Sequence, residues 1–192
     1  MARIAVFASG RGSNFVAIAK ALAGMPHGIE FLLCDVDGAP VLDRARELKI
    51  PEVVVSYAGA QRQAVEKKIV RHLERRGVDV VALAGFMRLL TPWFLEAFKG
   101  PVINIHPSLL PKYPGIHGIE ESYKSGDSEL GITIMRVDEG VDTGPVILQR
   151  SFVRDPSESI EQVEARIHAL EHEWYPRVLR EMLDRIDAGG AP

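Results

Sequence analysis

Short, unbroken runs of apolar residues alternate along the chain with segments in which apolar residues recur every three or four positions. Unbroken runs rich in Val, Ile and Leu are typical of strands covered on both faces, whereas the wider spacing is typical of amphipathic helices. The predicted strands are 3–8, 29–36, 51–56, 78–85 and 101–106. The helices predicted between them are 14–22, 41–49, 61–76 and a short one at 92–98.

The pattern changes after residue 106. Three prolines between 107 and 114 predict a stiff loop, because proline fixes its own φ angle and lacks a backbone N–H. A helix is expected to end at Gly126, and apolar runs at 131–137 and 145–153 flank the turn DEGVDTG, which favours an antiparallel pair. A capping box, Ser159 with Gln162, then predicts a long terminal helix that Pro176 interrupts or kinks.

Strands alternating with helices indicate an α/β fold. We expect a Rossmann-like, doubly wound, mostly parallel sheet with helices on both faces and an antiparallel edge region near 130–153. One domain is expected over 1–187, with a frayed tail at 188–192. In such sheets ligands bind beyond the carboxyl ends of the strands, so the loops that follow the strands are where a site is expected.

Composition narrows the class of protein. The formal net charge of the 192 residues is −3 and the basic residues are dispersed, so nucleic acid is not an expected partner. The single cysteine, Cys34, fits a reducing compartment and, within an apolar run, is expected in the core. The first residues lack the longer apolar segment of a signal peptide, and no stretch approaches the ~20 apolar residues of a membrane span. A cytoplasmic protein without membrane contact is expected.

The loop ASGRGSN (8–14) is the first candidate site, because it follows a predicted strand and opens a helix. The backbone N–H groups of Gly12, Ser13 and Asn14 could converge there on a phosphate. The loop lacks both the third glycine of a dinucleotide fingerprint and the GK[ST] of a P-loop. A plain strand-to-helix turn, capped by Ser13 or Asn14, is an equally good interpretation.

The second candidate is the pair Asn104 and His106. Residues two apart on a strand share a face, so both side chains are expected to point the same way. Histidine exchanges protons near neutral pH, and an asparagine amide can donate a hydrogen bond to a developing oxyanion. The alternative is a polar pair that merely closes a strand. It is less favoured, because two polar side chains leave the same apolar strand together.

Two carboxylates complete the candidates. Asp142 could orient His106 if the two met, but its place in a glycine-rich turn favours ordinary turn chemistry. Glu171 borders the apolar stripe of the terminal helix, where a solvated ion pair is commoner than a ligand contact. No cluster of His, Cys and carboxylates has metal-ligand spacing, so no metal is expected.

Together these motifs resemble the folate-dependent formyltransferases. The resemblance covers nearly the whole chain through ASGRGSN, VVALAGFMRLLTP, NIHPSLLPKYPG, VDEGVDTGPVILQ and ALEHEWYP. The GSN loop and the short chain resemble the branch whose acceptor is glycinamide ribonucleotide (GAR). This likeness implies transfer of a formyl group from N10-formyltetrahydrofolate to the amine of GAR in purine (IMP) synthesis, without a metal, by a monomer or homodimer.

The resemblance also implies residue roles. The positions that match the catalytic residues are Asn104, His106 and Asp142. Those that match GAR-binding residues are Gly12, Ser13, Asn14 and Arg62 for the phosphate, and Glu171 for the ribose or amine end. Those that match the folate pocket are Met87, Arg88, Leu89, Leu90, Asn104, Val137, Asp138, Glu139, Gly140, Val141 and Asp142.

Three positions depart from the family pattern and keep alternatives open. Met135 stands where the family often has a histidine, as do Ile119 and Ser122 in the helix after the proline loop. A formyltransferase for another amine, such as an amino sugar nucleotide or the methionyl group of initiator tRNA, is one alternative; the tRNA enzyme normally has an added basic domain. A non-catalytic folate- or nucleotide-binding relative is another, although a pure binder has no need of the catalytic trio.

Overall fold

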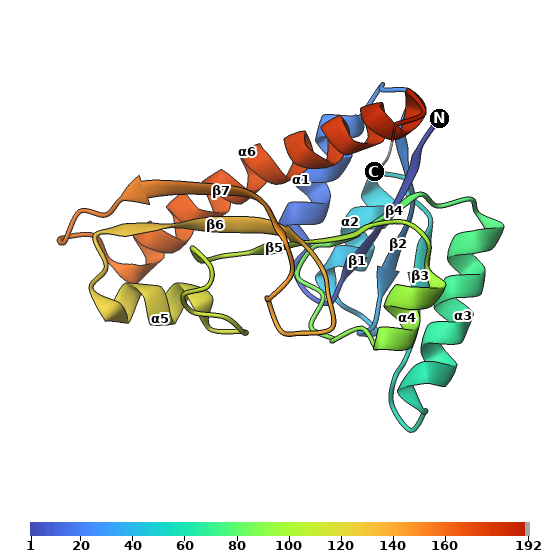
Figure 1. Cartoon of the computed structure of the whole chain (residues 1–192), viewed down its shortest axis with the longest axis horizontal. Helices are drawn as coiled ribbons and strands as arrows, with labels where there is room; N and C mark the ends of the chain where they lie inside the picture. The colour runs from blue at the N-terminus through green and yellow to red at the C-terminus, as the bar shows by residue number, and fades with distance from the viewer. Residues whose placement is uncertain (191–192) are drawn as a thin grey trace.

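The computed structural model describes residues 1–190 and has a central sheet with helices on both faces (Figure 1). The strands are β1 (Arg3–Ala8), β2 (Gly28–Cys34), β3 (Glu52–Val54), β4 (Val80–Leu83), β5 (Val102–His106), β6 (Glu129–Arg136) and β7 (Val146–Val153). The helices are α1 (Ser13–Leu22), α2 (Pro40–Glu47), α3 (Arg62–Arg75), α4 (Pro92–Ala97), α5 (Gly118–Ser125) and α6 (Ile160–Asp187).

The sheet has the order β3-β2-β1-β4-β5-β6-β7. The pairs from β3 to β5 are parallel, whereas β6 runs antiparallel to both β5 and β7. The mostly parallel, doubly wound sheet with an antiparallel edge, as predicted from the sequence, is confirmed. Strand order reverses direction between β1 and β4, and the loops that follow these two strands border the crevice where such folds bind ligands.

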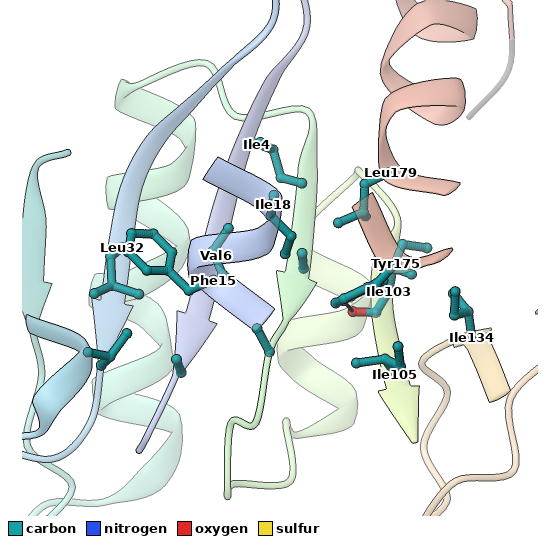
Figure 2. Packing of buried hydrophobic residues seen from close by; sticks show 14 of the residues in the cluster. Ile4, Val6, Phe15, Ile18, Leu32, Ile103, Ile105, Ile134, Tyr175 and Leu179 are labelled. Atoms are coloured by element: carbon teal, nitrogen blue, oxygen red, sulfur yellow. Dashed lines mark hydrogen bonds between the residues drawn. The ribbon is translucent and has the colours of Figure 1, made fainter. Parts of the chain in front are cut away.

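The apolar runs form strands because alternate residues enter two separate cores. In β1, Ile4 and Val6 pack into one core and Ala5 and Phe7 into the other. Figure 2 shows the first core, in which Ile4 and Val6 lie with Phe15 of α1. Both faces of the strand are therefore removed from water, which explains the absence of a polar alternation in its sequence.

The helices divide between the two faces. Helices α1, α2 and α6 cover one face, and α3 and α4 cover the other (Figure 1). Tyr175 of α6 is fully buried, and its hydroxyl shares one proton between the carbonyls of Leu83, at 3.0 Å, and Ile103, at 2.9 Å. Burial raises the pKa of this phenol, so it remains a donor and ties α6 to the ends of β4 and β5.

Three expectations about secondary structure differ from the structure. Helix α6 is one helix across Pro176, so the predicted interruption is wrong, while the kink stays a prediction. Pro176 is buried on a face that also carries Tyr175 and Leu179, and packing of that face sustains the helix. The strand expected at 51–56 is only Glu52–Val54, and the one expected at 78–85 is only Val80–Leu83. Of the predicted tail, Gly189 and Gly190 bond to the carbonyls of Ile186 and Arg185, and 191–192 lie outside the described residues.

Candidate active site

Asn104 and His106 project together from the end of β5, as the strand period predicts. Their neighbours Ile103 and Ile105 point into the core shared with α1 and α6 (Figure 2), so the two polar side chains occupy the opposite face. On that opposite face of β5, Val102 packs into the core formed with α3 and α4. The next two side chains on the same face, Asn104 and His106, line a cavity.

His106 is 4% exposed, and both of its ring nitrogens have partners. Nε2 lies 2.8 Å from the carbonyl oxygen of Tyr113. Because a carbonyl only accepts, Nε2 carries a proton and the other nitrogen, Nδ1, faces Asp142 at 3.4 Å. Gly118 closes the third side, since a Cβ there would lie 3.0 Å from Nε2. The imidazole is thus held in one orientation, with a proton on Nε2.

Asp142 meets both polar residues of β5, although the sequence alone favoured a turn role for it. Its Oδ1 lies 3.4 Å from the amide nitrogen of Asn104, and its Oδ2 accepts the backbone N–H of Gly115 at 2.8 Å. The turn role belongs to Asp138 instead, which accepts from the N–H of Gly140 and the hydroxyl of Thr143. The interpretation of Asp142 as turn chemistry is therefore wrong.

The loop 8–14 begins α1 without a side-chain cap. Gly12 is the N-cap residue with φ +76°, so the alternative in which Ser13 or Asn14 caps the helix is wrong. A Cβ at Gly12 would lie 2.4 Å from Cγ2 of Val41, which is why glycine is required at this close approach. With no side-chain acceptor on them, the first N–H groups of α1 can receive an anion.

Glu171 of α6 is buried rather than solvated. It is 4% exposed, and Nδ1 of His168 lies 2.7 Å from its Oε2. The hydrogen bond to Glu171 raises the pKa of His168, which favours a protonated imidazole beside the carboxylate. Burial lowers the pKa of the neighbouring His172, whose ring stacks on that of His168. The expectation of a solvated ion pair at Glu171 is therefore wrong.

The segment 87–90 is held by a buried carboxylate from β2's end. Asp35 accepts hydrogen bonds from the hydroxyl of Ser9 and, at 2.6 Å, from Nε of Arg88. The same Ser9 oxygen accepts the backbone N–H of Met87 at 2.9 Å. The guanidinium of Arg88 also lies over the ring of Tyr57. This network fixes the segment against the end of β1.

A second buried carboxylate holds the other end of this segment. Glu66 of α3 is fully buried, and it accepts hydrogen bonds from the backbone N–H of Thr91, at 3.0 Å, and from the Thr91 hydroxyl. Its negative charge and, above all, burial raise the pKa of Tyr57 to about 12. The segment between Met87 and Thr91 is consequently anchored at both ends.

These elements surround one cavity of about 720 Å³, a size typical of small-molecule sites. It is lined by the predicted residues Gly12, Ser13, Asn14, Met87, Arg88, Leu89, Leu90, Asn104, His106, Val137, Asp138, Glu139, Gly140, Val141, Asp142 and Glu171. Four exposed apolar side chains lie on its wall, namely Met87, Leu89, Ile116 and Val141. Apolar surface of this kind beside a few polar groups is typical of a site that binds a small molecule with an apolar part.

The structure does not bring Arg62 into this group. Arg62 is the first residue of α3, is exposed, and is not among the described residues that line the cavity. Sequence reasoning missed Arg11, Glu164 and His168, all of which line it. His168 lies one helical turn before Glu171 and Glu164 lies two turns before it, so the shared face of α6 was the signal that could have found them.

Within residues 1–190, no group of three or more His, Cys, Asp and Glu side chains is arranged to hold a metal ion. In the same part of the chain, no helix combines the length and apolarity needed to cross a membrane.

Comparison with known proteins agrees with this fold and site. Residues 2–179 match the family described as formyl transferase. The chain therefore belongs to the formyl transferase family.

Several relatives are similar to the chain over nearly their full length. The chain is 42% identical to phosphoribosylglycinamide formyltransferase of Bacillus subtilis (strain 168), over 98% of each protein. It is 48% identical to the crystal structure of glycinamide ribonucleotide transformylase 1 from Geobacillus kaustophilus, with a TM-score of 0.90 over 95% of this chain and 99% of that one. It is 40% identical to phosphoribosylglycinamide formyltransferase from Streptococcus pneumoniae TIGR4, whose crystal structure matches with a TM-score of 0.87 over 95% of this chain and 99% of that one.

Proposed function

We propose that the protein transfers the formyl group of N10-formyltetrahydrofolate to the amine of GAR, giving formyl-GAR and tetrahydrofolate in purine synthesis. The observation that carries the proposal is the contact of one carboxylate, Asp142, with both Asn104 and His106 at the wall of a large cavity. Names shared by relatives of nearly full-length similarity support the same choice of substrates.

In the first step the amine of GAR attacks the formyl carbon, and the electron pair of the carbonyl bond moves to oxygen. The amide N–H of Asn104 donates to this oxyanion. The Nδ1 proton of a protonated His106 is a second donor, because the 3.4 Å between Nδ1 and Asp142 is longer than an ordinary N–H···O hydrogen bond and leaves that proton able to bond a substrate oxygen. Donors of this kind, fixed before the charge develops, contribute roughly a hundred- to a thousand-fold in rate each.

In the second step the bond from the formyl carbon to N10 breaks and the carbonyl re-forms. The amine has lost a proton and N10 must gain one, so a base that accepts and then returns the same proton satisfies both needs. Asp142 performs this transfer through a water molecule. Positioned acid/base groups contribute about 10²–10⁴-fold. Neither step, as proposed, requires a metal.

The two substrates are proposed to enter from different sides of the trio. The N-terminal amides of α1 after Gly12 bind the phosphate of GAR, and Glu171 binds its ribose or amine end. The apolar walls at 87–90 and 137–142 bind the pterin ring of the folate. Arg62 is proposed, as the family resemblance implies, for the phosphate, although its place at the start of α3 gives that role no support. A cytoplasmic location and a monomeric or homodimeric state remain predictions.

A spectrophotometric assay tests the proposal. N10-formyl-5,8-dideazafolate is supplied as donor with GAR, with an amino sugar nucleotide, or with no acceptor. Loss of the formyl group only with GAR is the expected result. Turnover with the amino sugar nucleotide alone assigns a different acceptor, and binding of the donor without turnover in any arm contradicts an enzymatic role.

A further inference from the structure

Tyr113 supplies the carbonyl that orients His106, and its backbone has an unusual conformation. Its φ is +56°, in the left-handed region that residues with side chains rarely adopt. Such a conformation persists only where surrounding contacts hold it. The carbonyl of Tyr113 nevertheless lies 2.8 Å from Nε2 of His106, so something must keep residue 113 in place.

Two sets of contacts hold residue 113. The buried hydroxyl of Ser108 lies 2.6 Å from the carbonyl oxygen of Lys112 and 3.3 Å from that of Tyr113. The side chains of both Lys112 and Tyr113 meet Asp127, just after α5. Oδ2 of Asp127 accepts hydrogen bonds from the hydroxyl of Tyr113 at 2.9 Å and from Nζ of Lys112 at 2.8 Å. Two consecutive residues of the proline loop are thus bound through their side chains to one oxygen. Asp127 itself is fixed by its own N–H, which donates to the hydroxyl of Ser125 at 3.1 Å.

The earlier part of the proline loop is anchored independently of Asp127. The hydroxyl of Thr133, on β6, donates to the carbonyl of Ser108 at 2.7 Å and accepts the N–H of Leu110 at 3.0 Å. Gln149 on β7 adds a hydrogen bond to the same hydroxyl at 2.9 Å. Losing Asp127 therefore leaves residues 108–110 in place and loosens residues 112–113, whose backbone keeps only the bonds to Ser108 and Leu109 and the contact with His106.

We infer that Asp127 is a positioning residue for His106. By binding the side chains of Tyr113 and Lys112, it holds the Tyr113 carbonyl against Nε2, which keeps the proton on Nε2 and Nδ1 turned to Asp142. The effect on turnover rests on the proposed function, whereas the effect on the imidazole does not.

The alternative is a surface ion pair without consequence for the site. Nζ of Lys112 is on a largely exposed side chain, and an exposed pair of this kind contributes little. The hydrogen bond from the Tyr113 hydroxyl is the contact that distinguishes the two views, because it joins Asp127 to the residue whose carbonyl meets His106.

Four variants separate these views. Asp127→Ala removes both contacts, and Tyr113→Phe removes only the hydroxyl. Asp127→Asn retains an oxygen acceptor for that hydroxyl and serves as the conservative rescue. Tyr123→Phe is the matched control, because its hydroxyl donates at 3.0 Å to the carbonyl of Glu158 instead.

The first readout is the ¹⁵N chemical shifts of the imidazole of His106 in ¹⁵N-histidine-labelled protein, assigned with His106→Gln. The wild type is expected to show a protonated Nε2. At a pH where the imidazole is neutral, before it takes up the second proton used in the proposed first step, the shifts of the two ring nitrogens in Asp127→Ala and Tyr113→Phe are expected to move toward each other as the tautomers mix. Asp127→Asn is expected to show a smaller change, and Tyr123→Phe none.

The second readout is kcat and KM in the dideazafolate assay. We expect kcat to fall about ten-fold in Asp127→Ala and Tyr113→Phe with KM nearly unchanged, because a misplaced catalytic group slows chemistry without preventing binding. Wild-type nitrogen shifts in both variants overturn the inference, as does a fall in kcat without any change of those shifts. An inactive wild type contradicts the proposed function alone, since the nitrogen shifts still decide the role of Asp127.

Discussion

Oδ2 of Asp142 accepts the backbone N–H of Gly115 at 2.8 Å, so the loop between β6 and β7 closes directly onto the proline loop. This contact joins segments 27 residues apart. It holds Asp142 at φ +54°, a conformation that is costly for aspartate by about 1–3 kcal/mol. The carboxylate is therefore fixed in position before any substrate arrives.

Asp142→Asn is expected to lower kcat by about 10²–10⁴-fold with little change in donor affinity, because an amide cannot carry the proton from the amine to N10. Steady-state kinetics and donor binding by fluorescence check this outcome. Asp155→Asn is the control, since Asp155 accepts from Ser157 in a turn away from the cavity-lining residues. Equal rates in the wild type and Asp142→Asn would remove Asp142 from the mechanism.

Gly118→Ala is expected to reduce kcat several-fold while the fold survives. The added Cβ lies 3.0 Å from Nε2 of His106 and 3.2 Å from the carbonyl of Tyr113, so the ring must shift by a few tenths of an ångström. Misplacement of a catalytic group by about 1 Å costs on the order of a hundred-fold, and a smaller shift costs less. Gly28→Ala, whose Cβ meets nothing within 4 Å, is the control, and a comparison of their kcat values decides the matter.

Gly12→Ala is expected to destabilise the fold by about 1–3 kcal/mol and to weaken binding of GAR. Both the φ of +76° and the 2.4 Å approach to Val41 disfavour a Cβ there. Gly24→Ala has a similar φ, +75°, but an open surrounding, so the difference between the two in urea unfolding isolates the clash. Adding Val41→Ala should recover part of the loss; full additivity would contradict the clash.

His168 is expected to stabilise the folded protein in a pH-dependent way. Its pKa is raised by Glu171 above the ordinary value near 6.5, so the contribution is complete below about pH 6.5 and is lost as the pH rises through the folded pKa. The side chain is 40% exposed, so screening limits the effect to roughly 0.5 kcal/mol.

Urea unfolding of the wild type and His168→Gln at several pH values measures this effect. The gap between the two proteins should narrow as the pH rises, and a gap that widens would contradict the assignment. In Glu171→Gln, NMR titration should show His168 titrating closer to its ordinary pKa, because the main cause of the shift has been removed.

The sheet could be predicted from the sequence because the pattern of apolar residues within each strand depends on which of its faces are buried. Apolar runs such as residues 3–8 reveal two covered faces, and the period of two placed Asn104 and His106 side by side. Neither inference depends on distant parts of the chain.

Contacts that depend on distant packing were not predictable in this way. Asp142 looked like a turn residue because only the conformation of its loop brings it to Asn104, 38 residues away. Glu66 stands in a charged stretch of α3, yet it is fully buried because Thr91 supplies its hydrogen bonds. The pairing of His168 with Glu171 was visible in the helical period of α6, but its burial depends on how α6 packs against α1.

The order of strands across the sheet has a consequence for how such a protein could change in evolution. The phosphate is proposed for the loop after β1, near α6, whereas the folate walls follow β4 and β6, and Asn104 and His106 stand on β5. The residues proposed to bind the acceptor and those proposed to bind the donor therefore lie on different loops of the same sheet. Mutations in α1 and α6 could recruit another amine while the formyl-donor half and its chemistry are inherited unchanged.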